Sequence, residues 1–214
     1  MLETLQKISP TDEVKMDNTW RQSADKTEET NLNSDIGWLA GVWDGEGSIG
    51  MHQHTKQKGR RVPRSSIVNT DFAIIEECSR ILKDMGVGNF VQTRYLPKKE
   101  HATRKDLTIA GMKRNKIFLE SIIPYLRGYK KIKAMLIMSF IYSRMMKPGS
   151  GRMRGGVPLD AFEESCVQKV ANDFDGNLNE FTLEWIDNIH KMYSELRRQY
   201  EEAAEMIARP QGSK

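Results

Sequence analysis

The chain has few cysteines and no long hydrophobic run. Only Cys78 and Cys166 occur among 214 residues, which excludes a small secreted scaffold held by disulfides. Each falls on the apolar stripe of an expected helix, so we expect two buried free thiols in an intracellular, reducing compartment, either a prokaryotic cytoplasm or an organelle. No segment approaches the ~20 apolar residues of a membrane span, and no signal peptide is recognisable. We therefore expect no membrane partner.

Positive charge is concentrated in the middle of the chain. The total is only +4, but residues 34–154 carry 23 basic and 10 acidic side chains, while residues 1–33 and 155–214 have net charges of −3 and −6. Such segregation favours a polyanionic partner, most simply nucleic acid. A solvated basic face on an ordinary soluble protein is the alternative. With 38% hydrophobic residues, the chain can form one core of ordinary size with extensions.

The most informative segment is 39–47, which reads LAGVWDGEG. We expect a helix here that begins at Ser34, a good N-cap residue. Gly37, Gly41 and Gly45 recur every four residues and therefore lie on one stripe. Because each helical glycine costs about 0.5–1 kcal/mol relative to alanine, the stripe makes sense if another backbone packs closely against it.

The same segment ends in two carboxylates set between glycines. Asp44 and Glu46 lie where the helix dipole is already negative, so they are unfavourable unless a cation joins them. Residues 45–50 also fit G-x-G-x-x-G, but that dinucleotide fingerprint follows a strand and opens a helix, and here the order is reversed. A purely structural, glycine-rich helix end is the remaining alternative.

Residues 39–47 resemble the nonapeptide that names the LAGLIDADG homing endonucleases. The residues at five positions are identical: Leu39, Ala40, Gly41, Asp44 and Gly47. The other four positions carry conservative replacements. In that family two such helices pack face to face across a two-fold axis, and the second acidic position binds divalent metal at the scissile phosphates. The resemblance implies Glu46 and the Gly45 carbonyl as ligands of Mg²⁺, for which Mn²⁺ or Ca²⁺ can substitute in binding. It also implies a helix–helix interface, formed by Gly37, Ala40, Gly41 and Asp44.

The chain contains one copy of this motif, so the partner helix must come from a second subunit. Downstream, alternating segments predict strands and 3.6-residue periodicity predicts helices. The expected strands are 48–56, 62–70, 89–96 and 105–110, and the expected helices are 71–85, 113–126, 130–146, 158–170 and 181–207. This is an α+β order that matches the family's α-β-β-α-β-β-α core, in which an antiparallel saddle straddles DNA, followed by extra C-terminal helices. We divide the chain into a polar extension that is flexible or loosely docked (1–33), the endonuclease core (34–175) and a C-terminal helical extension (176–214).

The outward faces of the strands should read base pairs. A β-ribbon enters the major groove, where arginine pairs with guanine and glutamine with adenine. The expected DNA-binding residues are Ser48, His52, His54, Lys56, Arg61, Arg64, Gln92 and Arg94. His52 and His54 share a face and could hold a transition metal, although no cysteine or further histidine stands at zinc spacing.

Two further catalytic residues follow from the resemblance. The family has a lysine that approaches the active site, and within residues 124–134 Lys130 fits best, with Lys131 and Lys133 as alternatives. Each of these lysines could instead contact the DNA backbone. Thr70 falls near the family's water-organising position, where some members have a glutamine that this chain lacks.

Taken together, the sequence predicts a homodimeric, metal-dependent, site-specific endonuclease that cuts double-stranded DNA. The alternative is a protein of the same fold that does not cleave, either a maturase that binds intron RNA or a DNA-binding regulator.

Overall fold

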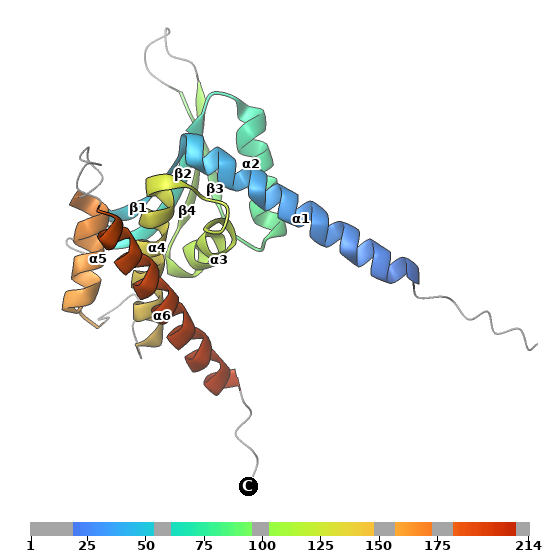
Figure 1. Cartoon of the computed structure of the whole chain (residues 1–214). Coiled ribbons are helices and arrows are strands. Elements are labelled where there is room, and N and C mark those ends of the chain that lie inside the picture. The colour runs from blue at the N-terminus through green and yellow to red at the C-terminus, as the bar shows by residue number, and fades with distance from the viewer. Residues whose placement is uncertain (1–18, 54–60, 96–102, 148–156, 173–181, 209–214) are drawn as a thin grey trace, which may run out of the picture. The chain divides into compact units, whose positions relative to one another are not determined.

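The computed structural model describes residues 19–53, 61–95, 103–147, 157–172 and 182–208. These residues form an α+β fold with one four-stranded antiparallel sheet (Figure 1). The elements are α1 (Thr19–Glu46), β1 (Gly47–Gln53), β2 (Arg61–Asn69), α2 (Phe72–Asp84), β3 (Phe90–Arg94), β4 (Arg104–Ala110), α3 (Met112–Ile122), α4 (Gly128–Met146), α5 (Ala161–Asn172) and α6 (Leu183–Ala208). The predicted fold class and element order are confirmed.

Helix α1 is longer than the sequence pattern predicted. It begins at Thr19, so the prediction that Ser34 caps its N-terminus is wrong, and the expected flexible extension is helical from Thr19 onward. No glycine or proline interrupts the chain between Thr19 and Gly37, so nothing stops the helix from continuing toward the N-terminus. The chain divides into two compact units, Met1–Ser34 and Asp35–Lys214.

The sheet separates a polar face from an apolar face. Its strand order is β1-β2-β4-β3, and the register places Gly50 opposite Arg64 and Gln92 opposite Asp106. On the other face, buried side chains meet the helices: Ile49, Met51, Ile67, Leu107 and Ile109. The register also decides between the adjacent residues Ile67 and Val68, because Ile67 is buried and Val68 is exposed.

The helix boundaries follow local signals. The Asp71 carboxylate accepts the Ala73 N–H at 2.9 Å and caps α2, and Gly86, at φ +72°, ends that helix in the left-handed region. Helix α3 ends at Ile122, two residues before Pro124, because proline has no backbone N–H with which to continue the helical hydrogen bonds.

Helix α4 lies at the centre of the helical layer, in contact with β1, α3, α5 and α6. It is buried on most sides, which explains why it has no polar stripe. The Glu163 carboxylate of α5, fully buried, pairs with Arg144 at 3.1 Å and with Lys147 at 2.8 Å. On α6, the Tyr200 ring lies 5.0 Å from that of Tyr142. Helix α6 therefore packs against α4 and belongs to the same compact unit as the sheet.

Both cysteines are buried and free, as predicted. Burial raises the pKa of each thiol, Cys78 and Cys166, to about 12, so neither is a thiolate near neutral pH. None of the described helices is both long and apolar enough to cross a membrane.

Candidate nucleic-acid interface

Most of the predicted DNA-binding residues within the described chain share the polar face of the sheet. His52 on β1, Arg64 on β2, and Gln92 and Arg94 on β3 line one shallow hollow of about 400 Å³. Ser48 is exposed opposite Ser66 on the same face. His54 and Lys56 lie outside the described residues.

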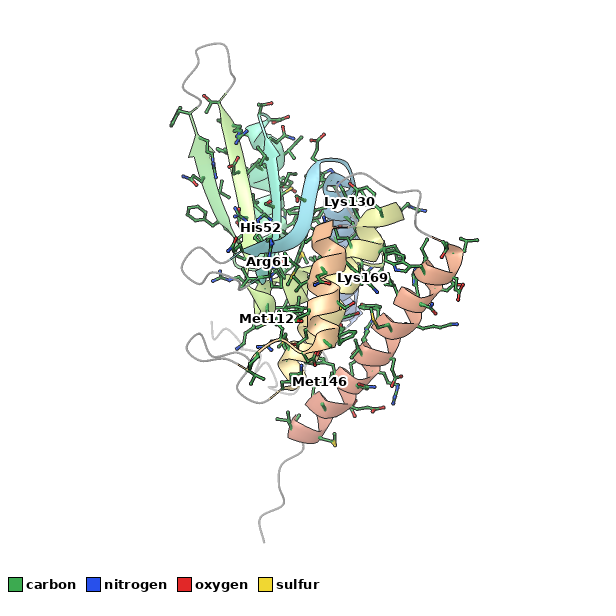
Figure 2. All side chains as sticks on the ribbon, turned by 90° about the vertical axis from the view of Figure 1, so that its left-hand side faces the viewer. His52, Arg61, Met112, Lys130, Met146 and Lys169 are labelled. Atoms are coloured by element: carbon green, nitrogen blue, oxygen red, sulfur yellow. The ribbon has the colours of Figure 1, made fainter. Side chains whose placement is uncertain are left out.

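Arg61 is arranged differently from this group. It pairs in register with Gln53, the neighbour of His52. Because neighbouring residues of a strand point to opposite faces, the Arg61 side chain leaves its strand on the face opposite to that of His52. Its guanidinium donates to the Met51 carbonyl at 3.4 Å. Figure 2 shows Arg61 beside His52 at this end of the sheet, where its charge reaches the imidazole.

Internal contacts hold the polar face in place. Arg64 donates to the Thr108 hydroxyl at 3.1 Å, and Arg94 forms a 2.5 Å ion pair with Asp106. The face also carries Phe90, whose side chain is 63% exposed. Sequence reasoning missed Asp106, Thr108 and Phe90, although two-residue alternation along β4 and β3 would have placed all three on the face of Arg94.

The electrostatics of this face are basic. The pKa of His52 lies below its ordinary value, first because burial disfavours the imidazolium and then because Arg64, Lys133 and Arg61 repel it. The lowered pKa keeps His52 neutral near pH 7. A polyanion placed on this face would offset the repulsion from the three basic residues and so raise the pKa of His52, while the effect of burial would remain.

The C-terminal end of α1 is joined to the start of α4. The Lys130 ammonium donates to the carbonyl oxygens of Trp43 at 2.8 Å and Asp44 at 2.6 Å, which satisfies two groups at the negative helix end. In return, the Asp44 carboxylate accepts the Arg127 N–H at 3.0 Å. Burial lowers the pKa of Lys130, while the charges of Asp44 and Glu46 act in the opposite direction. Figure 2 labels Lys130 in this position.

Glu46, the last residue of α1, has an exposed carboxylate. Its charge is felt by Lys130, but no hydrogen bond to it is formed within the described residues. No group of three or more histidine, cysteine or acidic residues among them could hold a metal ion. One protomer thus offers a carboxylate and the adjacent Gly45 carbonyl, a hard oxygen donor set that suits Mg²⁺ when waters and phosphate oxygens complete the shell.

The glycines of α1 have different surroundings. A Cβ atom at Gly41 or Gly45 would meet nothing within 4 Å, whereas one at Gly37 would lie 3.8 Å from the Tyr125 ring. The stripe is therefore open over its C-terminal half. Gly47 is different again, because a Cβ there would collide with Trp43, including its Cα at 2.8 Å.

Two of the predicted interface residues make contacts within their own protomer. Ala40 has no exposed surface, so its side chain belongs to the core and cannot contact a second subunit. The reason is helical phase, since Ala40 lies beside the buried Leu39 and Trp43. Asp44 is half-buried, and its carboxylate accepts the N–H of Arg127, the residue before α4, while Gly37 and Gly41 remain predicted interface positions.

Thr70 lies in the turn between β2 and α2, with an exposed side chain. Its neighbours build that turn, because the Asn69 side chain accepts the Asp71 N–H at 2.8 Å and Asp71 caps α2. A catalytic role for Thr70 stays a prediction.

No family model and no curated protein matches the chain. Solved structures that it resembles include the homing endonuclease I-CvuI in complex with its target, at 18% identity over 78% of this chain and 98% of that one, with a TM-score of 0.47. An archaeal intron-encoded homing endonuclease, I-Vdi141I, complexed with DNA, is 12% identical over 77% of this chain and 98% of that one, with a TM-score of 0.47. The LAGLIDADG meganuclease I-CpaMI, bound to uncleaved DNA, is 17% identical over 75% of this chain and 49% of that one, with a TM-score of 0.41.

Proposed function

We propose that the protein is a site-specific, divalent-metal-dependent DNA endonuclease that acts as a homodimer. One observation carries the proposal. The exposed Glu46 carboxylate ends a helix whose glycine stripe is open at Gly41 and Gly45, and Lys130 is fixed to that same helix end.

Binding is assigned to the polar face of the sheet. Arg64 projects from β2, and Gln92 and Arg94 project from β3 on the other side of β4, around the hollow. These side chains match the donor and acceptor patterns of base edges in the major groove. Basic residues around them attract phosphates without regard to sequence. The face can therefore supply both affinity and selectivity.

Catalysis is assigned to the end of α1. A divalent ion such as Mg²⁺, held by Glu46 and the Gly45 carbonyl, would neutralise charge at the scissile phosphate and lower the pKa of an attacking water. Lys130, held within 3 Å of two carbonyls of this helix end, keeps the end of α1 in place and adds a positive charge beside Glu46. Thr70, at the turn after β2, is the proposed water-orienting residue.

Cutting both strands requires two such helix ends. Each protomer carries one motif, and the open half of its glycine stripe, flanked by the exposed Trp38, leaves room for the equivalent helix of a second copy. Pairing across a two-fold axis brings two Glu46 carboxylates together, which repel each other until cations bind between them. The dimer would then contact a long, imperfectly palindromic site.

The direct test is to incubate the protein with Mg²⁺ and a randomised duplex DNA library and to sequence the cleaved ends. The proposal expects enrichment of one imperfect palindrome among the ends and no cleavage when EDTA replaces Mg²⁺. Bound but uncut duplex, with the same sequence enriched in Mg²⁺, would contradict the nuclease and leave a binding protein.

A protein of the same fold that binds without cleaving is the second candidate. It is favoured by the sheet face, whose hollow and held arginines are complete within one protomer. Such a protein would be a regulator that binds DNA or a maturase that binds intron RNA. Competition between folded intron RNA and the selected duplex separates these two.

A further inference from the structure

An acidic side chain lies in the middle of the basic sheet face. Asp106 points outward from β4, two residues from Arg104 and from Thr108, and faces Gln92 of β3 in register. Its side chain is only 11% exposed. A carboxylate here repels DNA phosphates, so its presence on a nucleic-acid interface needs an explanation.

Two arginines cover this carboxylate. Arg94 reaches one oxygen through its Nε at 2.5 Å, and Arg104 reaches the other through its Nε at 3.5 Å. In both ion pairs the closest approach is through Nε, at the inner end of the guanidinium. About half of the Arg94 side chain, 49%, stays exposed, so its outer end is available to a ligand above the sheet.

Stability alone does not explain the arrangement. Ion pairs to exposed arginines contribute little to folding, burial of the Asp106 carboxylate carries a desolvation cost, and one of its oxygens makes no hydrogen bond to the described residues. A β-branched residue would suit this strand position at least as well. The carboxylate has a definite effect on the arginines, however, because it fixes the direction of a long side chain that is otherwise free to rotate.

That direction determines what an arginine reads. An unrestrained arginine on a basic face is drawn to phosphate oxygens, which carry no sequence information. An arginine held at Nε over the sheet can instead present its outer amino groups to a guanine edge. The negative charge also cancels part of the attraction to any duplex, whatever its sequence.

We propose that Asp106 is a positioning residue for sequence recognition. It holds Arg94 and Arg104 toward base edges and away from phosphates, and it lowers affinity for unrelated DNA in exchange for selectivity at the target. The inference rests on the proposed DNA-binding function of the sheet face, but it does not depend on cleavage.

The test compares the full-length wild type with three variants. Asp106→Asn keeps the side-chain shape and removes the charge, while Arg94→Ala removes one of the arginines held. Glu76→Gln is the matched control, because Glu76 pairs with Lys105, the residue next to Asp106 on the same strand but on the opposite face of the sheet. Each protein is taken through binding selection from a randomised duplex library. Its affinity for one fixed duplex of unrelated sequence is also measured over a range of salt, and its thermal unfolding is recorded.

For Asp106→Asn we expect a loss of selectivity of about tenfold or more at one symmetric pair of positions. Affinity for the unrelated duplex should rise, and the slope of log K against log salt should steepen by about 0.9 for each arginine that turns to a phosphate. Arg94→Ala should lose selectivity at overlapping positions without any steepening, and Glu76→Gln should match the wild type. A merely structural role for Asp106 would lower the unfolding temperature and weaken binding to both kinds of duplex.

Wild-type selectivity and an unchanged salt slope in Asp106→Asn would overturn the inference. So would weaker binding to the unrelated duplex. A wild type that enriches no sequence would refute the proposed function itself, and in that case the salt slope of Asp106→Asn still decides whether the carboxylate restrains the arginines from phosphate contact.

Discussion

The polar face of the sheet and the end of α1 differ in how much of each is built by one chain. On the sheet, arginines are held by Thr108 and Asp106 and surround a defined hollow. At the end of α1, Glu46 is exposed and the surface at Gly41 and Gly45 is open. The proposed function therefore assigns recognition to the single protomer and cleavage to a pair of protomers.

The strongest test of this division is Glu46→Gln. The variant should lose cleavage by at least about 10³-fold, because a divalent ion contributes several kcal/mol of transition-state stabilisation, while selection of duplex DNA stays at the wild-type level. Cleavage and binding are measured on the same selected duplex. Glu164→Gln, an exposed acid on α5, serves as the control. Full cutting activity in folded Glu46→Gln would remove Glu46 from the catalytic site.

Lys130→Met should slow cleavage by about 10²-fold, the usual cost of removing one preorganised cation or donor from an active site. It also leaves the carbonyls of Trp43 and Asp44 without their donor, so the free energy of unfolding should fall by roughly 1–3 kcal/mol. Single-turnover cleavage and urea unfolding measure the two effects. If Lys131→Met slows cleavage more than Lys130→Met does, the roles of the two lysines are reversed.

Gly41→Leu addresses the second half of the comparison. Position 41 is exposed and an added Cβ meets nothing within 4 Å, so folding of the protomer should be unaffected, but a leucine would overpack a close helix pair at a cost of about 1–3 kcal/mol per site. Symmetry applies this cost twice, so dimerisation should weaken by roughly 30-fold or more, as measured by sedimentation with and without DNA. Ser194→Leu on α6, also exposed, controls for added surface hydrophobicity. A wild type that stays monomeric in both conditions and still cuts both strands would exclude the dimer.

The smallest expected effect is the response of His52 to pH. Its folded pKa lies below 6.5, and bound phosphates should raise it. Duplex affinity should therefore increase as pH falls from the pKa of the bound form to that of the free form, by about threefold if the two differ by half a unit. His52→Gln should abolish this increase. The stability of the protein without DNA should change in the opposite direction. Because the folded pKa of His52 is lowered, the free energy of unfolding should decrease as pH falls from 6.5 toward that folded pKa. A pH-independent affinity in the wild type would show that His52 does not lie near bound phosphates.

The sequence predicted most of the fold because its local signals were unambiguous. Two-residue alternation placed His52 and Arg94 on one face, and Asp71 and Gly86 marked the ends of α2. It failed where the deciding factor was long-range. Ala40 belongs to the motif by sequence, but its position depends on how α1 packs in the core. The role of Asp106 also depends on two arginines, one of which lies on another strand, and no local pattern reveals that contact.

Mixed dimers give the most direct test of whether cleavage belongs to the pair. Wild-type and Glu46→Gln protomers carrying different affinity tags are co-expressed, and the doubly tagged dimers are purified and incubated with a supercoiled plasmid that contains the selected site. If each protomer supplies one carboxylate to the cutting of the DNA, the mixed dimer should bind like the wild type and yield nicked circles rather than linear DNA. Linear product at the wild-type rate would contradict the account, because a single Glu46 would then suffice for both strands.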